Sequence, residues 1–173
     1  MCTSIIEIVR AEGMAKRGDE WFTLSQAVVA YDHARHAPLG DVITLDFLNT
    51  GLDPGARAGI ELTLATAKEM GYDRVIAVHQ PFTYSRTKML MDDFAKVLRA
   101  ADQVVLLPIM GGREKDDGSV RSEDLAAKLP GSVVVDGLEG AAAWVRQNAK
   151  KGDLVVCMSC GDLYKAADMM VEK

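Results

Sequence analysis

The segment HQPFTYSRT, residues 79 to 87, concentrates side chains that can bind an anion directly after an apolar run. Arg86 can offer a two-point hydrogen-bonding fork to a carboxylate or a phosphate. Tyr84, Ser85 and Thr87 place hydroxyl groups around it, and a helix beginning near Thr87 would add free backbone N–H groups. We predict an anion site centred on Arg86. The alternative is a surface arginine beside a Ser/Thr helix cap.

Three further loops follow apolar runs and are rich in groups that bind ligands. Ligands of open α/β sheets bind beyond the carboxyl ends of the strands, where such loops gather. The candidate residues in these loops, besides the segment 79 to 87, are Asn49, Arg113, Glu114, Lys115, Gly161 and Asp162.

Two other pairs of residues have spacings that could bind metal or carry redox chemistry. His33 and His36 lie three residues apart, but no third ligand is suggested, so we favour a solvated helix end. Cys157 and Cys160 form a CxxC pair, but a zinc site would need a second pair, and Cys157 falls in a predicted core strand. We therefore predict no metal site.

The elements that position these loops are visible as short apolar runs. Five runs are rich in β-branched residues and nearly continuous, as expected of parallel strands buried on both faces, and segments with helical spacing separate them. The pattern predicts an α/β fold: a Rossmann-like open, mostly parallel sheet of five or six strands with helices on both faces. The runs are 42–47, 75–79, 104–109, 132–136 and 154–158.

The first 40 residues are less regular. They predict a helical N-terminal segment, an appendage or a linker, with short helices at 5–15 and 22–36, ahead of an α/β domain at 41–173. The length of 173 residues suits one main hydrophobic core.

The composition limits the cellular location and the binding partners that we predict. The net charge of −5 argues against nucleic acid or an anionic membrane as partner. No apolar run is long enough to cross a bilayer. Three cysteines and no signal peptide predict a reducing, cytoplasmic location. The sequence lacks GxGxxG after the first strand, GxxxxGK[ST] and GxSxG, so it predicts no standard dinucleotide, P-loop or hydrolase site.

Three motifs in order resemble the C-terminal domain of the Mur ligases. They are RVIAVHQPFTYSRTKMLMDDFAKVL, REKDDGSVRSEDLA and KKGDLVVCMSCGDLYKAADMM. The resemblance runs from about residue 42 to the C-terminus. It implies a Rossmann-like domain of an ATP- and magnesium-dependent ligase that joins an amino acid to a UDP-linked muramyl carboxylate during peptidoglycan synthesis.

The same resemblance implies roles for single residues. Tyr84, Ser85, Arg86 and Thr87 would hold the carboxylate of the amino acid, and Asp46 would lie near the nucleotide, with Asn49 beside it. Gly161, Asp162 and Lys165 would form the turn and helix start of the last motif.

Departures from the family pattern leave two functions open. The chain reads TLDFLNT where the family has DDYAHHP, and it places His79 in the strand and Phe82 in the loop of a pattern that resembles FQPHxYSRT. One reading is a ligase domain that acts with the missing ligase domains and is not catalytic alone. The other is a free-standing, non-catalytic module that binds a ligand or another protein. In either case we expect the site to bind an anion more readily than it supports ligation.

Overall fold

The computed structural model describes five short N-terminal strands and then nearly all of the chain from Asp53 to Val171. Cys160 is the one residue within that second range that lies outside the description, and side chains are described from Ile60 onward, Leu62 excepted. The N-terminal strands are β1 (Ile6–Val9), β2 (Met14–Arg17), β3 (Glu20–Thr23), β4 (Val28–Asp32) and β5 (Asp41–Phe47).

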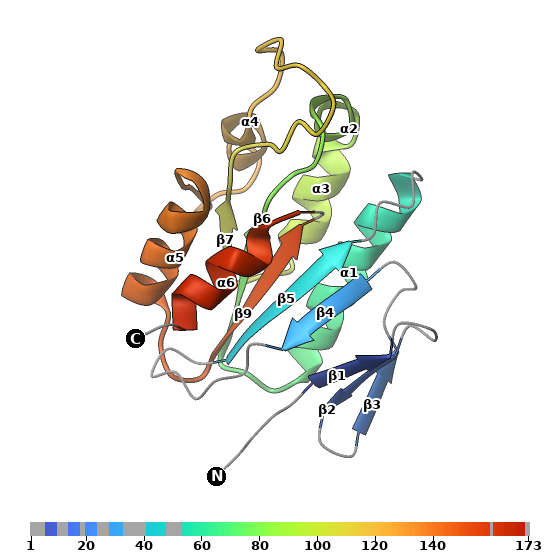
Figure 1. Ribbon diagram of the computed structural model, residues 1–173, viewed down its shortest axis with the longest axis vertical. Helices are drawn as coiled ribbons and strands as arrows, with labels where there is room; N and C mark the ends of the chain where they lie inside the picture. Colours follow the sequence, from blue (N-terminus) through green and yellow to red (C-terminus); the bar gives the residue numbers. More distant parts are fainter. Residues whose placement is uncertain are drawn as a thin grey trace.

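From β5 onward, helices and strands alternate along the chain (Figure 1). The elements are α1 (Asp53–Glu69), β6 (Arg74–His79), α2 (Tyr84–Met89), α3 (Met91–Leu98), β7 (Gln103–Leu106), α4 (Ser122–Ala126), β8 (Val133–Val134), α5 (Gly137–Asn148), β9 (Asp153–Ser159) and α6 (Leu163–Val171).

The main sheet has six strands in the order β4-β5-β9-β6-β7-β8. All neighbours pair in parallel except β4, which pairs antiparallel with β5. Four of the strands, β6 to β9, lie in the part of the chain whose side chains are described. The predicted α/β fold class is confirmed, and each of the five predicted runs overlaps a strand of this sheet.

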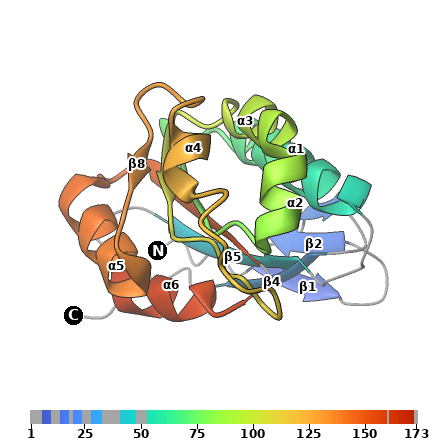
Figure 2. The same ribbon diagram turned by 90° about the horizontal axis from the view of Figure 1, so that it is seen from above.

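Helices cover both faces of the sheet, which Figure 2 shows from above. Because side chains alternate along a strand, Val75 and Ala77 of β6 pack against α1, α3 and α4, whereas Ile76 and Val78 face α5 and α6. The strands are therefore buried on both sides. This double burial explains why they read as continuous apolar runs rather than as alternating ones.

The prediction of helices in the first 40 residues is wrong. The structure places β1, β2 and β3 there in a separate antiparallel sheet, and β4 on the edge of the main sheet. Strands of four or five residues are too short for their side-chain period to be separated from a helical one. The domain boundary near residue 41 stays a prediction. Within the described residues, no helix is long and apolar enough to cross a membrane.

Candidate functional site

The candidate site lies at the point of the sheet where the connections from neighbouring strands leave toward opposite faces. β9, the last strand in sequence, lies between β5 and β6. The helices that follow β5 and β6 pack on one face of the sheet, whereas α6, which follows β9, packs on the other. Loops leaving neighbouring strands toward opposite faces open a crevice at the carboxyl ends, the usual ligand position in this class of fold.

Three loops meet at this edge of the sheet around Met110. The Thr83 amide donates to the Met110 carbonyl at 2.8 Å, and the Met110 amide donates to the Pro81 carbonyl at 2.9 Å. The loops after β6 and β7 therefore continue the parallel pairing of their strands. Gly161, after β9, lies so close to Met110 that an added Cβ would be 2.7 Å from its sulfur. The predicted convergence of the motif loops is thus present for these three, although Met110 carried no recognisable signal.

Arg86 lies inside α2, not before it, since the helix begins at Tyr84 rather than near Thr87. Its guanidinium carbon is 5.9 Å from the centre of the Phe82 ring, within range of a cation–π contact. The same ring lies against the backbone of Gly112. Phe82, the residue that departs from the family pattern, therefore provides the surface on which Arg86 rests.

Thr87 and Tyr84 have different environments. Thr87 is fully buried, and its hydroxyl donates to the Thr83 carbonyl at 2.7 Å, so its geometry supports the start of α2. Tyr84 is half-buried, and its ring lies on the backbone of Gly111, where any larger residue would collide with it. Of the four predicted carboxylate-binding residues, Thr87 therefore has a structural role, while Ser85 is exposed and Tyr84 and Arg86 are half-buried.

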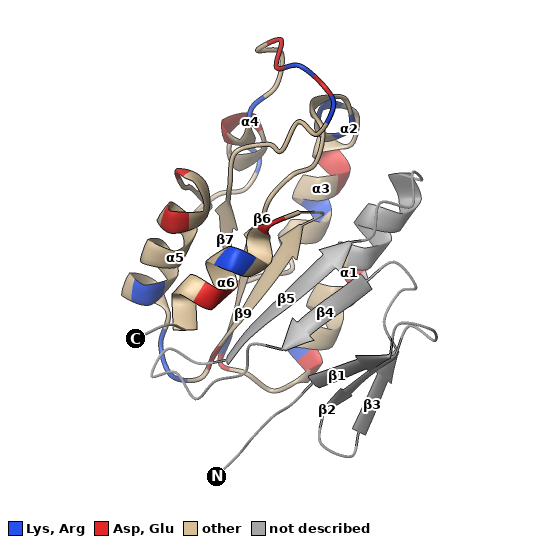
Figure 3. Ribbon diagram, in the orientation of Figure 1, with Lys and Arg blue, Asp and Glu red and all other residues tan. Residues whose placement is uncertain are grey.

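Glu114 makes a two-point contact with Ser85. The hydroxyl of Ser85 donates to Oε1 of Glu114 at 2.5 Å, and the backbone amide of Ser85 donates to Oε2 at 2.9 Å. These hydrogen bonds, together with the positive charge of Arg86, lower the pKa of the Glu114 carboxyl. The charged loop that carries Glu114 lies beside α2 at the top of Figure 3. The sequence offered Glu114 only as a loop contact and gave no indication of its partner.

The remaining predicted loop residues are at the surface. Arg113 and Lys115 flank Glu114 and are exposed. Asp162 and Lys165 form an ion pair of 2.6 Å at the start of α6, and the hydrogen bond from Lys165 raises the pKa of its amine. All four side chains are exposed, two in the loop after β7 and two near the start of α6.

The predicted nucleotide residues are only partly described. The backbone of Asp46 pairs with that of Ser159 at the end of β9, which places it at the same edge of the sheet. Asn49, His33, His36 and Cys160 lie outside the described residues. Among the residues that are described, no group of three or more His, Cys, Asp or Glu side chains could hold a metal ion.

His79, the last residue of β6, and Cys157, within β9, are core residues. His79 is 4% exposed, its Nδ1–H donates to the Met158 carbonyl at 3.0 Å, and burial lowers its pKa to about 4. Cys157 is fully buried, and burial raises the pKa of its thiol to about 12. The neutral imidazole therefore belongs to the packing beneath the site, and the buried thiol has the character of a core residue, as the sequence predicted.

A pocket of about 400 Å³ opens beside the three loops, at the carboxyl ends of β7 and β8. Its lining includes Tyr84, Asp116 of the charged loop, Arg121 and Asp136. The start of α2 and the charged loop thus border both the Arg86 site and this pocket.

The fold and these loops define an open α/β domain with a ligand site at the carboxyl ends of its strands, and the comparisons identify its family. A family model described as "Mur ligase, glutamate ligase domain" matches residues 56–161, and a family of unknown function (DUF6295) matches residues 1–90. The chain therefore belongs to the family of Mur ligase C-terminal domains.

The most similar curated proteins include UDP-N-acetylmuramate–L-alanine ligases. The ligase of Acetivibrio thermocellus is 37% identical over 117 residues, which is 65% of this chain and 25% of that protein. The ligase of Clostridium perfringens is 38% identical over 117 residues, 65% of this chain and 26% of that protein. The chain thus spans about a quarter of the length of these relatives and resembles their C-terminal domain.

Solved structures show the same fold. The UDP-N-acetylmuramate–alanine ligase of Thermotoga maritima superimposes with a TM-score of 0.56 at 20% identity, over 80% of this chain and 28% of that chain. A murein peptide ligase of Psychrobacter arcticus gives a TM-score of 0.54 at 21% identity, over 78% of this chain and 28% of that chain.

Proposed function

We propose that this chain is the amino-acid-contacting domain of an ATP-dependent Mur-type ligase of peptidoglycan synthesis, which acts in the cytoplasm on a UDP-muramyl substrate. The observation that carries the proposal is the meeting of the loops after β6, β7 and β9 next to Arg86, in a chain whose curated relatives are named for joining UDP-N-acetylmuramate and L-alanine. Fold and family membership alone would not assign a site, so the proposal depends on these contacts.

In this proposal the guanidinium of Arg86 binds the carboxylate of the amino acid. The contact with the Phe82 ring restricts the conformations of the Arg86 side chain before any ligand binds. Less conformational entropy is therefore lost when the carboxylate binds. The hydroxyl of Ser85 and the ring of Tyr84 border the same place. The domain therefore orients an amino acid, and the contribution to the rate comes from that positioning.

ATP and magnesium are assigned to other ligase domains. The sequence has no phosphate-cradling GxxxxGK[ST] segment, and the described residues offer no cluster of metal ligands. Asp46 and Asn49 remain proposed contacts to the nucleotide from this side. We derive no chemical step through either group and propose that the chain does not catalyse ligation by itself.

Calorimetric titration of the purified chain with L-alanine tests the proposal. We expect weak binding that Arg86→Ala abolishes and Arg86→Lys reduces, because an ammonium cannot reproduce the two-point fork. Lys88→Ala is the matched control, an exposed cation on the same helix, and it should bind like the wild type. Equal binding by Arg86→Ala and wild type would overturn the assignment of the carboxylate site. Absence of binding to L-alanine, with and without ATP and magnesium, would favour the non-catalytic interaction module.

A further inference from the structure

The contact between Glu114 and Ser85 places a carboxylate of the protein beside the arginine proposed to bind the carboxylate of a ligand. Both oxygens of Glu114 are engaged, one by the Ser85 hydroxyl and one by the Ser85 amide. The guanidinium of Arg86 acts on the same carboxylate through its charge. An incoming carboxylate would find these donors already in use.

The contact is long-range and is made by an exposed loop. Glu114 lies 29 residues from Ser85 in sequence, and every residue from Gly112 to Ser119 is exposed. Within this loop, Asp116 and Asp117 accept hydrogen bonds from the nearby Gly118 and Ser119 amides, and the charge of Lys88 on α2 also acts on Asp117. Glu114 makes direct hydrogen bonds from the loop to α2, whereas Asp117 interacts with Lys88 of that helix through charge.

α2 itself supplies no substitute for Glu114. Thr83, the residue before the helix, makes no capping hydrogen bond with its side chain, and the first turn contains no acidic residue. The Glu114 carboxylate performs the function that an N-cap side chain usually has. A ligand that removed Glu114 would have to satisfy the same donors with an anionic group of its own.

We propose that Glu114 is an internal competitor that sets the specificity of the Arg86 site, and that the loop 111–118 is a latch that an anionic ligand must displace. The inference rests on the proposed function, because it takes Arg86 as the anion-binding group. A weak anion such as acetate would be excluded by the latch. A ligand that also carries an ammonium group could displace Glu114 from Ser85 and pair its ammonium with the displaced carboxylate. The latch thus favours a zwitterionic amino acid over a simple carboxylate.

Release of the latch would also widen access to the neighbouring pocket. Tyr84, next to Ser85, and Asp116, two residues after Glu114, both line the pocket of about 400 Å³. Movement of the loop therefore changes the carboxylate site and the pocket wall together. The contact between Glu114 and Ser85 then controls both the room for the side chain of an amino acid and the access of its carboxylate to Arg86.

The test compares acetate and L-alanine binding by NMR titration of the ¹⁵N-labelled chain. Because removal of a competing charged hydrogen-bond acceptor is worth a few-fold in affinity, Glu114→Gln should bind acetate about fivefold more tightly than the wild type. Its preference for L-alanine over acetate should fall by a similar factor. Asp92→Asn, which removes the same charge from an exposed position on α3 outside the pocket lining, should bind both ligands like the wild type.

A second measurement reports on the latch without any ligand. Exchange of the Ser85 amide hydrogen should be faster in Glu114→Ala than in the wild type, since its acceptor is gone. Unchanged exchange, or acetate binding by Glu114→Gln that is no tighter than that of the wild type, would overturn the latch. If L-alanine still binds in an Arg86-dependent manner in that case, the proposed function survives and the latch alone is wrong. If neither ligand binds to any variant, both are wrong.

Discussion

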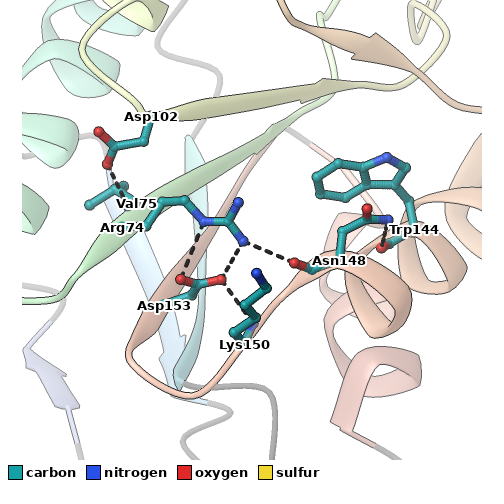
Figure 4. Close-up of polar contacts among 7 residues, drawn as sticks. All are labelled: Arg74, Val75, Asp102, Trp144, Asn148, Lys150 and Asp153. Atoms are coloured by element: carbon teal, nitrogen blue, oxygen red, sulfur yellow. Dashed lines mark hydrogen bonds and ion pairs between the residues drawn. The ribbon is translucent and has the colours of Figure 1, made fainter.

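Arg74 and Asp153 join the amino ends of β6 and β9 through a two-point ion pair (Figure 4). Nη2 of Arg74 lies 2.5 Å from Oδ2 of Asp153, and Nε lies 3.2 Å from Oδ1. Asp153 is 4% exposed and also accepts from the Lys150 amide, while Arg74 donates to the Asn148 carbonyl. The contact fixes the two central strands at the end of the sheet opposite the candidate site, so it aligns the loops at the other end.

Asp153→Ala should therefore destabilise the domain strongly. Loss of a buried carboxylate leaves Arg74 and the Lys150 amide without their acceptor, a change that typically costs about 3 kcal/mol. Urea unfolding followed by circular dichroism measures the free energy of unfolding. Asp92→Ala, which removes an exposed ion pair with Lys128, is the control and should leave the midpoint nearly unchanged. Equal shifts of the midpoint in both variants would contradict the role given to Asp153.

A second prediction concerns the pH dependence of stability and the buried His79. Its pKa is lowered from 6.5 to about 4, chiefly by burial, so the unfolded chain binds the proton more readily than the folded one between these values. The free energy of unfolding should therefore be fully retained above pH 6.5 and should fall as the pH is lowered toward 4. A shift of this size corresponds to about 3 kcal/mol.

His79→Gln provides the comparison, because glutamine does not titrate and can still donate to the Met158 carbonyl. Between pH 6.5 and 4.5 the free energy of unfolding of this variant should depend less on pH than that of the wild type. Carboxylates titrate in both proteins, so their effect cancels in the difference. Parallel curves for the two proteins would show that His79 is not the group responsible.

The sheet was predictable from the sequence because its strands are buried on both faces. That burial demands continuous apolar runs, and α1, α3 and α5 had enough residues for a helical period to appear. β1 to β4 were missed since four or five residues show too little of any period. His79 was placed at the end of a predicted strand, and the structure buries it there in the core.

The site was only partly predictable, since its contacts are long-range. Local types and spacing indicated Arg86 and its neighbours, and the resemblance to a family supplied their roles. The pairing of Ser85 with Glu114 depends on the path of a loop between β7 and α4, which no local pattern encodes. The contact of Gly161 with Met110 likewise follows from the strand order, in which β9 lies next to β6.

Two glycines of the charged loop allow a third prediction. Gly112 and Gly118 both have positive φ, at 63° and 70°, so alanine at either position strains the backbone by about 1 kcal/mol. A Cβ on Gly112 would in addition lie 3.1 Å from the Phe82 ring, whereas one on Gly118 would meet nothing within 4 Å. Gly112→Ala should therefore cost more stability than Gly118→Ala and should weaken L-alanine binding by moving the ring under Arg86. Equal losses of stability and affinity would mean that Phe82 does not hold Arg86.

The last prediction is that Cys157 is unreactive in the folded protein. Its side chain is fully buried in the core formed with α5 and α6, and burial raises the pKa of its thiol to about 12, so almost no thiolate is present at pH 8. Alkylation by iodoacetamide needs the thiolate and needs access, and both require unfolding of the strand. Modification of Cys157 in the native chain should be at least about a hundredfold slower than in urea.

Because the sequence also contains Cys2 and Cys160, the rates are measured by mass spectrometry of the separate peptides, with Cys157→Ala as the control for assignment. Labelling of Cys157 at similar rates in the native and unfolded chains would contradict its place in the core and would revive a redox role for the CxxC pair.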